Sequence, residues 1–79
     1  MERYKNLSGS SGVIAFEIGD DWIVVEFAGE ASAIDRRYRY TVARAGAPNI
    51  LEMKRLAQSG RGLATFIARN RPAYEDERR

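Results

Sequence analysis

Apolar and polar positions alternate along two short stretches near the N-terminus of this chain. Every second position between residues 12 and 18 carries a large apolar side chain, which is the pattern of a strand with one buried face. Residues 22–27 are apolar on both faces near their middle, as expected of a central strand. Glycine and two aspartates occupy residues 19–21, so we expect a tight turn that joins the two stretches into an antiparallel hairpin.

The alternation returns in residues 37–43, which predicts a third strand. Tyr38 and Tyr40 share one face of that strand with Val42. Arg37 and Arg39 share the other face, because successive side chains of a strand point to opposite sides.

After Pro48 the spacing of apolar residues becomes that of a helix. Asn49 is placed to cap this helix, and Glu52 follows at the spacing of a capping box. Gly60 is a natural end for it. Residues 62–70 then predict a second short helix with its own apolar face.

The predicted fold is therefore α+β, in the order β-β-β-α-α. A three-stranded antiparallel sheet is followed by two short C-terminal helices packed on one face, which completes a two-layer domain. We expect residues 12–74 to form a single domain, preceded by a flexible leader (1–11) and followed by a charged tail (75–79). A chain of 79 residues has room for one domain only.

The composition removes several classes of function. The chain contains no cysteine and no histidine, so it lacks the usual transition-metal ligands and the usual general base near neutral pH. Its adjacent carboxylates fall in the expected hairpin turn and at the C-terminus, where no pocket is expected. We therefore expect a protein that is not an enzyme and that needs no cofactor or metal.

No feature indicates a membrane. No apolar stretch approaches the roughly 20 residues of a transmembrane helix, and the N-terminus lacks a signal core. We expect a cytoplasmic protein without a membrane partner. It would be a monomer, or a weak homodimer formed through an edge strand.

Charge is divided unevenly along the chain. Residues 1–35 carry two basic and seven acidic side chains, whereas residues 36–71 carry nine basic and one acidic. Eleven of the thirteen basic residues are arginine, whose guanidinium fork suits phosphate and stacks on bases. A polyanion is the partner that this division favours.

Three segments form a recognisable series along the chain. They are, in order, Ser10-Ser11-Gly12-Val13-Ile14, Tyr38-Arg39-Tyr40, and Leu56-Ala57-Gln58-Ser59-Gly60-Arg61 leading to Leu63 and Ile67. Together they resemble a known family, the KTSC domain. The resemblance covers roughly residues 8–74. KTSC domains occur at the C-terminus of some lysyl-tRNA synthetases and as separate bacterial proteins. The resemblance implies a small α+β fold and, through the synthetase context, RNA binding.

The leading hypothesis is a small non-catalytic module that binds RNA or single-stranded nucleic acid through an arginine-rich surface. Arg61, Thr65 and Arg69 are spaced to line one helical face. The alternative is a solvated basic face that pairs with the acidic first half of the chain. The candidate phosphate contacts are Arg37, Arg39, Lys54, Arg55, Arg61, Arg69 and Arg71.

Tyr38 and Tyr40 have two interpretations. They are either a stacking platform for unpaired bases or core residues packed beneath the helices. If the tyrosines face the helices, Arg37 and Arg39 must lie on the open side of the sheet, so the two pairs cannot share one surface.

The second hypothesis is a protein-interaction module, an adaptor or a small inhibitor, that docks an acidic partner protein. Trp22 and Val24 would then form an apolar hot spot if both are exposed.

Overall fold

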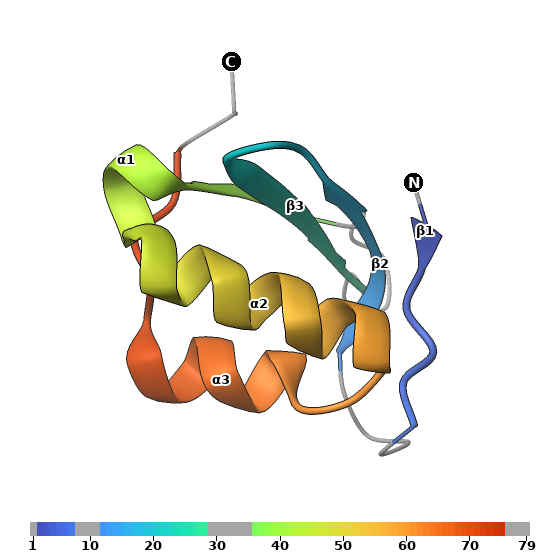
Figure 1. The fold of residues 1–79 in the computed structure, drawn as a ribbon. Helices are drawn as coiled ribbons and strands as arrows, with labels where there is room; N and C mark the ends of the chain where they lie inside the picture. The colour runs from blue at the N-terminus through green and yellow to red at the C-terminus, as the bar shows by residue number, and fades with distance from the viewer. Residues whose placement is uncertain (1, 8–11, 29–35, 76–79) are drawn as a thin grey trace.

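The computed structural model describes residues 2–7, 12–28 and 36–75 of the chain (Figure 1). Four antiparallel strands form one sheet in the order β1-β2-β3-β4. The strands are β1 (Glu2–Arg3), β2 (Val13–Ile18), β3 (Trp22–Phe27) and β4 (Arg36–Thr41). The helices are α1 (Val42–Ala45), α2 (Ala47–Ser59) and α3 (Leu63–Asn70).

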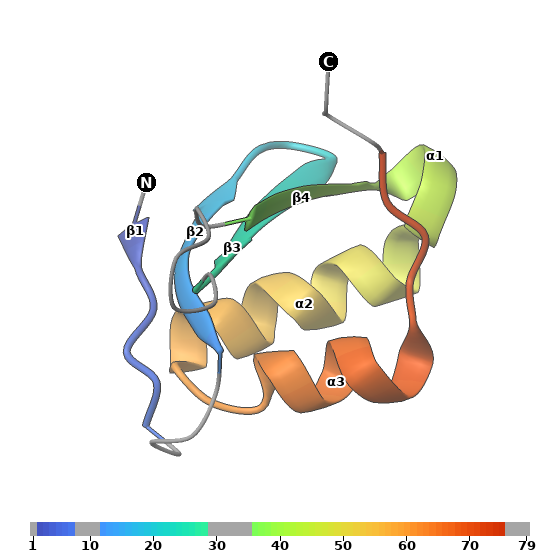
Figure 2. The same cartoon turned by 180° about the vertical axis from the view of Figure 1, so that it is seen from behind.

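The helices follow the sheet in the chain, and α2 and α3 lie side by side against one of its faces (Figures 1 and 2). The predicted α+β class is confirmed, as are the β2–β3 hairpin and the two longer helices. The sheet has one strand more than predicted, and the described residues contain a short additional helix, α1. None of the described helices is both long and apolar enough to cross a membrane.

The additional strand comes from the predicted leader, so that prediction is wrong for residues 2–7. Glu2 and Arg3 pair with β2, and the Tyr4 ring is only 3% exposed. The Tyr4 hydroxyl accepts a hydrogen bond from the backbone N–H of Leu63 at 3.3 Å, which satisfies a free donor at the start of α3. Residues 1 and 8–11 lie outside the described residues.

The third predicted strand, 37–43, begins one residue too late and ends two residues too late. β4 ends at Thr41, whose Oγ1 accepts a hydrogen bond from the N–H of Arg44 at 3.2 Å and so caps α1. The predicted capping box of α2 is also wrong, because Gly46 precedes the helix and Asn49 already lies inside it. The Asn49 amide donates to the Ala45 carbonyl instead, and Glu52 binds Arg55.

The corner between α2 and α3 depends on glycine. Gly60 ends α2 with φ of 83°, the left-handed conformation expected of it. A Cβ at this position would lie 2.7 Å from the Cβ of Lys5, since the N-terminal segment packs against the corner. The N–H of Leu7 donates to the Gly60 carbonyl at 2.6 Å. This close approach explains how the first residues of the chain are attached to the helices.

The core lies between the sheet and the helices. β3 supplies the centre of its sheet side, because Ile23 and Val25 are both fully buried. Removing the apolar side chains of the core from water is the main source of the protein's stability. The largest fully buried side chains are Phe16, Ile23, Ile50, Met53, Leu63, Val13 and Val25.

Candidate functional site

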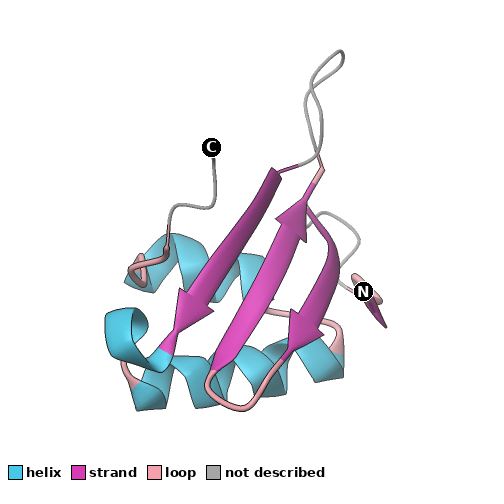
Figure 3. Ribbon diagram, turned by 90° about the horizontal axis from the view of Figure 1, so that it is seen from above, coloured by secondary structure: helices cyan, strands magenta, loops and turns pink. Residues whose placement is uncertain are grey.

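β4 separates the residues of the Tyr-Arg-Tyr motif onto two faces of the sheet. Tyr38 pairs with Val25 and Tyr40 with Ile23, which places both tyrosines on the helix side. Arg37 and Arg39 alternate with them and lie on the side facing away from the helices, which we call the open face. Figure 3 shows that no described helix covers the open face. The tyrosines therefore belong to the helix side, as their core interpretation predicts.

At the hairpin end of the open face, Trp22 contacts Arg39. The guanidinium carbon of Arg39 lies 4.7 Å from the centroid of the Trp22 ring, a cation–π arrangement. The ring also lies against the hairpin turn, where a Cβ on Gly19 would be 1.9 Å from its Cε2 atom. Trp22 therefore contacts both the turn and an arginine, and it remains partly exposed.

Charges of both signs flank this contact. The Nε atom of Arg37 lies 3.8 Å from a Glu26 carboxylate oxygen, although the Arg37 side chain is 61% exposed. The strand register places Arg3 in the same cross-strand row and Glu17 in the next row. Glu75 is the bridge partner of Arg39 and so shares its row. The described part of the open face thus carries three arginines and three glutamates and has no net charge.

Val24 lies on the open face beside Arg39 but is only 7% exposed. The expected apolar hot spot of Trp22 and Val24 is therefore wrong for Val24. Alternation assigns a side chain to a face of the sheet but does not determine how much of it is covered there.

Two of the predicted phosphate contacts already have partners in the protein. The ammonium group of Lys54 donates to the backbone carbonyls of Gly19 and Asp20, at 2.7 and 2.9 Å, and attaches α2 to the hairpin turn. Arg55 donates from Nε to Glu52 at 3.1 Å on the solvent side of α2. This pairing lowers the pKa of the Glu52 carboxyl and raises the pKa of Arg55.

The remaining predicted contacts do not line one helical face. α3 begins at Leu63, and Gly62 before it has φ of 85°, so Arg61 lies outside the helix that contains Thr65 and Arg69. Arg61, Arg69 and Arg71 are exposed in the helical layer, on the other side of the sheet from the open face. The predicted surface of Arg37, Arg39, Arg61 and Arg69 is therefore divided between two sides of the molecule.

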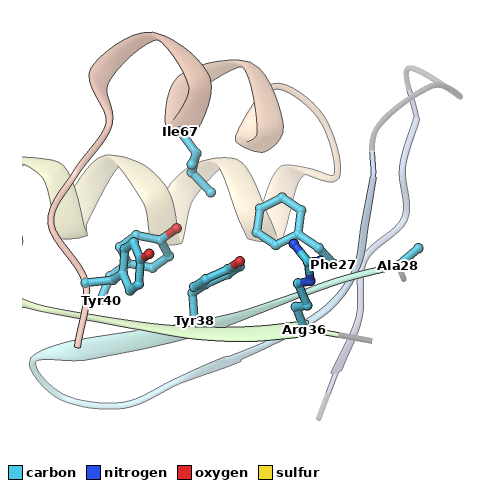
Figure 4. A pocket seen from close by; sticks show the side chains of 7 residues that line it. Phe27, Ala28, Arg36, Tyr38, Tyr40 and Ile67 are labelled. Atoms are coloured by element: carbon cyan, nitrogen blue, oxygen red, sulfur yellow. The ribbon is translucent and has the colours of Figure 1, made fainter. Parts of the chain in front are cut away.

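A pocket of about 390 Å³ opens between β4 and α3 (Figure 4). The Ile67 side chain extends into it from α3, and the Tyr38 and Tyr40 rings line it from the sheet. We call it the aromatic pocket. Its lining residues are Phe27, Ala28, Arg36, Tyr38, Tyr40, Ile67 and Tyr74.

The four aromatic rings of the pocket contact one another edge to face. Tyr38 lies 5.7 Å from Phe27 and 4.8 Å from Tyr74 between ring centroids, and Tyr40 lies 5.9 Å from Tyr74. Burial, with smaller effects of Tyr38 and Tyr74, raises the pKa of Tyr40 to about 12. The Tyr40 hydroxyl therefore stays protonated and can donate a hydrogen bond.

The C-terminal segment completes the pocket. The N–H of Glu75 donates to the Arg39 carbonyl at 2.7 Å, which ties the segment to the edge of β4 and keeps Tyr74 against the other tyrosines. The expectation that Tyr74 packs back onto the domain is confirmed. Glu75 thus belongs to the sheet edge rather than to the predicted tail, and residues 76–79 lie outside the described residues.

The sequence did not reveal Phe27, Arg36 or Ile67 as site residues. Phe27 and Ile67 carried an apolar signal that predicts core, and Arg36 was one of many arginines. The described residues contain no group of three acidic, cysteine or histidine side chains that could hold a metal ion.

Comparison of the chain with models of known families, with curated proteins and with solved structures gave no match. The resemblance to the KTSC domain therefore remains a prediction from the motifs.

Proposed function

We propose that this protein is a non-catalytic module that binds single-stranded nucleic acid, RNA first, on the open face of its sheet. The observation that carries the proposal is the stack of Arg39 on Trp22 at 4.7 Å, on a face that no described helix covers. A partly exposed indole held beside a guanidinium offers one surface for stacking and a charge for phosphate. The proposed KTSC relationship agrees with this function but is not needed for it.

The geometry favours a single strand over a duplex. Stacking requires an accessible base face, and a base stacked on an aromatic side chain gains about 1–3 kcal/mol. Arg37, 61% exposed and one row away from the Trp22–Arg39 contact, is placed for the neighbouring phosphate. A short strand lying across the open face would contact these groups without reaching Arg61 or Arg69.

The glutamates of the open face set the strength of the contact. Glu17, Glu26 and Glu75 offset the charge of the arginines, so few phosphates are neutralised. With about three phosphate contacts, the logarithm of the affinity should fall with the logarithm of salt concentration with a slope of about −2. We expect weak, salt-dependent binding with little sequence preference.

The test is titration of a fluorescent oligouridylate at about 50 and 200 mM salt with Arg39→Gln and with a matched control. Arg69→Gln removes the same charge from the helical layer and serves as that control. Arg39→Gln should weaken binding about tenfold, because it removes both the phosphate contact and the support of the indole. Equal affinity of the two variants, or no binding by the natural chain at low salt, would contradict the proposal.

A second candidate is docking of an acidic protein on the helical layer. Two observations favour it: Leu51 is 69% exposed on α2, and the exposed charged side chains of residues 42–71 are all basic. A pull-down should then recover a partner that survives nuclease treatment and is lost with Leu51→Asp. A partner that disappears with nuclease would show that nucleic acid bridged the two proteins.

A further inference from the structure

The aromatic pocket has the composition of a site for a flat, uncharged group attached to an anion. Phe27, Tyr38 and Tyr74 supply aromatic surface, and the tyrosine hydroxyls supply hydrogen-bonding groups. Among the described residues that line it, Arg36 is the one charged residue and none is acidic. Sites for small molecules combine apolar walls with a few polar groups in this way.

The size of the pocket limits the ligand. Its volume of about 390 Å³ lies near the lower end of the range of roughly 300–1,000 Å³ for small-molecule sites. A single nucleotide is of this scale, whereas a stacked pair of bases or a folded segment of another protein is not.

The position of the pocket connects it to the open face. Arg36 and Arg37 are neighbours on β4, and strand alternation places Arg36 on the pocket side and Arg37 on the open side. A single strand of nucleic acid that crosses this edge of the sheet can therefore place one phosphate at each guanidinium while one of its bases enters the pocket.

We propose that the aromatic pocket takes one unpaired nucleobase, with Arg36 bound to the phosphate attached to it. The base lies among Tyr38, Tyr74 and Ile67, and the hydroxyls of Tyr38 and Tyr40 contact its edge. This inference deepens the proposed function and rests on it, because the base would come from a bound single strand of nucleic acid. A free mononucleotide has the same chemistry and is the other source.

The experiment follows the methyl signal of Ile67 by NMR while adenosine monophosphate, adenosine or ribose 5-phosphate is added. The monophosphate should shift this signal and should bind more tightly than adenosine, and ribose 5-phosphate should leave it unmoved. Arg36→Gln should weaken binding of the monophosphate about tenfold and leave binding of adenosine unchanged, because only the phosphate contact is lost. Arg44→Gln, an exposed arginine on α1, is the matched control and should have no effect.

A second variant tests the base contact. Tyr74 is 45% exposed, so Tyr74→Leu should leave the core intact, as the unchanged methyl signals of Ile23 and Val25 would show. Loss of one stacking ring should weaken the binding of both adenosine and its monophosphate by about 5-fold to 100-fold. Unchanged binding in both Tyr74→Leu and Arg36→Gln would overturn the inference.

Titration with an oligoadenylate separates the inference from the proposed function. If the oligoadenylate shifts the Ile67 signal and competes with the monophosphate for binding, both the inference and the proposed function are supported. Oligoadenylate binding without movement of Ile67 overturns the pocket assignment and leaves the open face as the site. Monophosphate binding without oligoadenylate binding supports the pocket as a free-nucleotide site and overturns the proposed function. If neither ligand binds, both proposals fail.

Discussion

The two sides of the sheet use similar residue types for different purposes. On the helix side, aromatic and aliphatic side chains from β2, β3 and β4 close against α2 and α3, and Tyr40 is only 3% exposed. On the open face, an aromatic ring and two arginines of β3 and β4 remain accessible to solvent. The comparison shows that one strand, β4, contributes to the core with one face and presents two arginines on the other. Three measurements test this division.

The largest effect is expected in the core. Met53 is completely buried, and Met53→Ala should lower the free energy of unfolding by about 3 kcal/mol through lost burial and a cavity. Leu51→Ala on the exposed side of the same helix is the matched control and should cost less than about 0.5 kcal/mol. Urea unfolding followed by circular dichroism measures both. Similar losses would mean that α2 does not separate core from surface.

An alkaline transition should come from Tyr40. Its pKa is about 12 in the folded protein and about 10 when unfolded, so only the unfolded state loses the proton between these values. Stability is therefore retained below pH 10 and falls as pH rises toward 12, by about 2 kcal/mol at most.

Tyr40→Phe removes the titrating group and should flatten this part of the stability profile, while Tyr74→Phe should not. Unfolding in urea at several alkaline pH values provides the measurement. If the stability of Tyr40→Phe still falls as steeply between pH 10 and 12, another group causes the loss of stability at alkaline pH.

The smallest effect on stability is expected on the open face. A Cβ at Gly19 would overlap the Trp22 ring, so Gly19→Ala should displace the indole. We expect a loss of about 1 kcal/mol, together with a red shift of tryptophan fluorescence as the ring becomes more exposed. Gly12→Ala is the control, because a Cβ there would meet only an ordinary contact with Phe27 at 3.8 Å. An unchanged emission spectrum would show that the glycine does not hold the ring.

Elements with a regular period were predictable from the sequence. β3 has the predicted bounds, the β2–β3 hairpin is present, and Gly60 ends α2 in the left-handed conformation. Such elements are determined by neighbouring residues, through alternation, helical spacing and the freedom of glycine to adopt positive φ. β1 was missed because two residues are too few to display a period, and its pairing with β2 depends on Tyr4 reaching the core.

The candidate site was predictable only in part. Alternation established that the tyrosines and arginines of β4 occupy opposite faces, but not which face the helices cover. The grouping of Arg61 with Arg69 failed because Gly62 interrupts the helix on which it depended.

The sequence alone determined the class of fold, the absence of histidine and cysteine chemistry, and an excess of arginine in the second half of the chain. Only the tertiary structure decided where the basic side chains lie: Lys54 on the hairpin turn, Arg55 on Glu52, Arg39 on Trp22 and Arg36 in the aromatic pocket. The reason is physical. Local conformation depends on residues within a few positions, whereas a binding surface depends on contacts between segments far apart in the chain, which form only when the core brings them together.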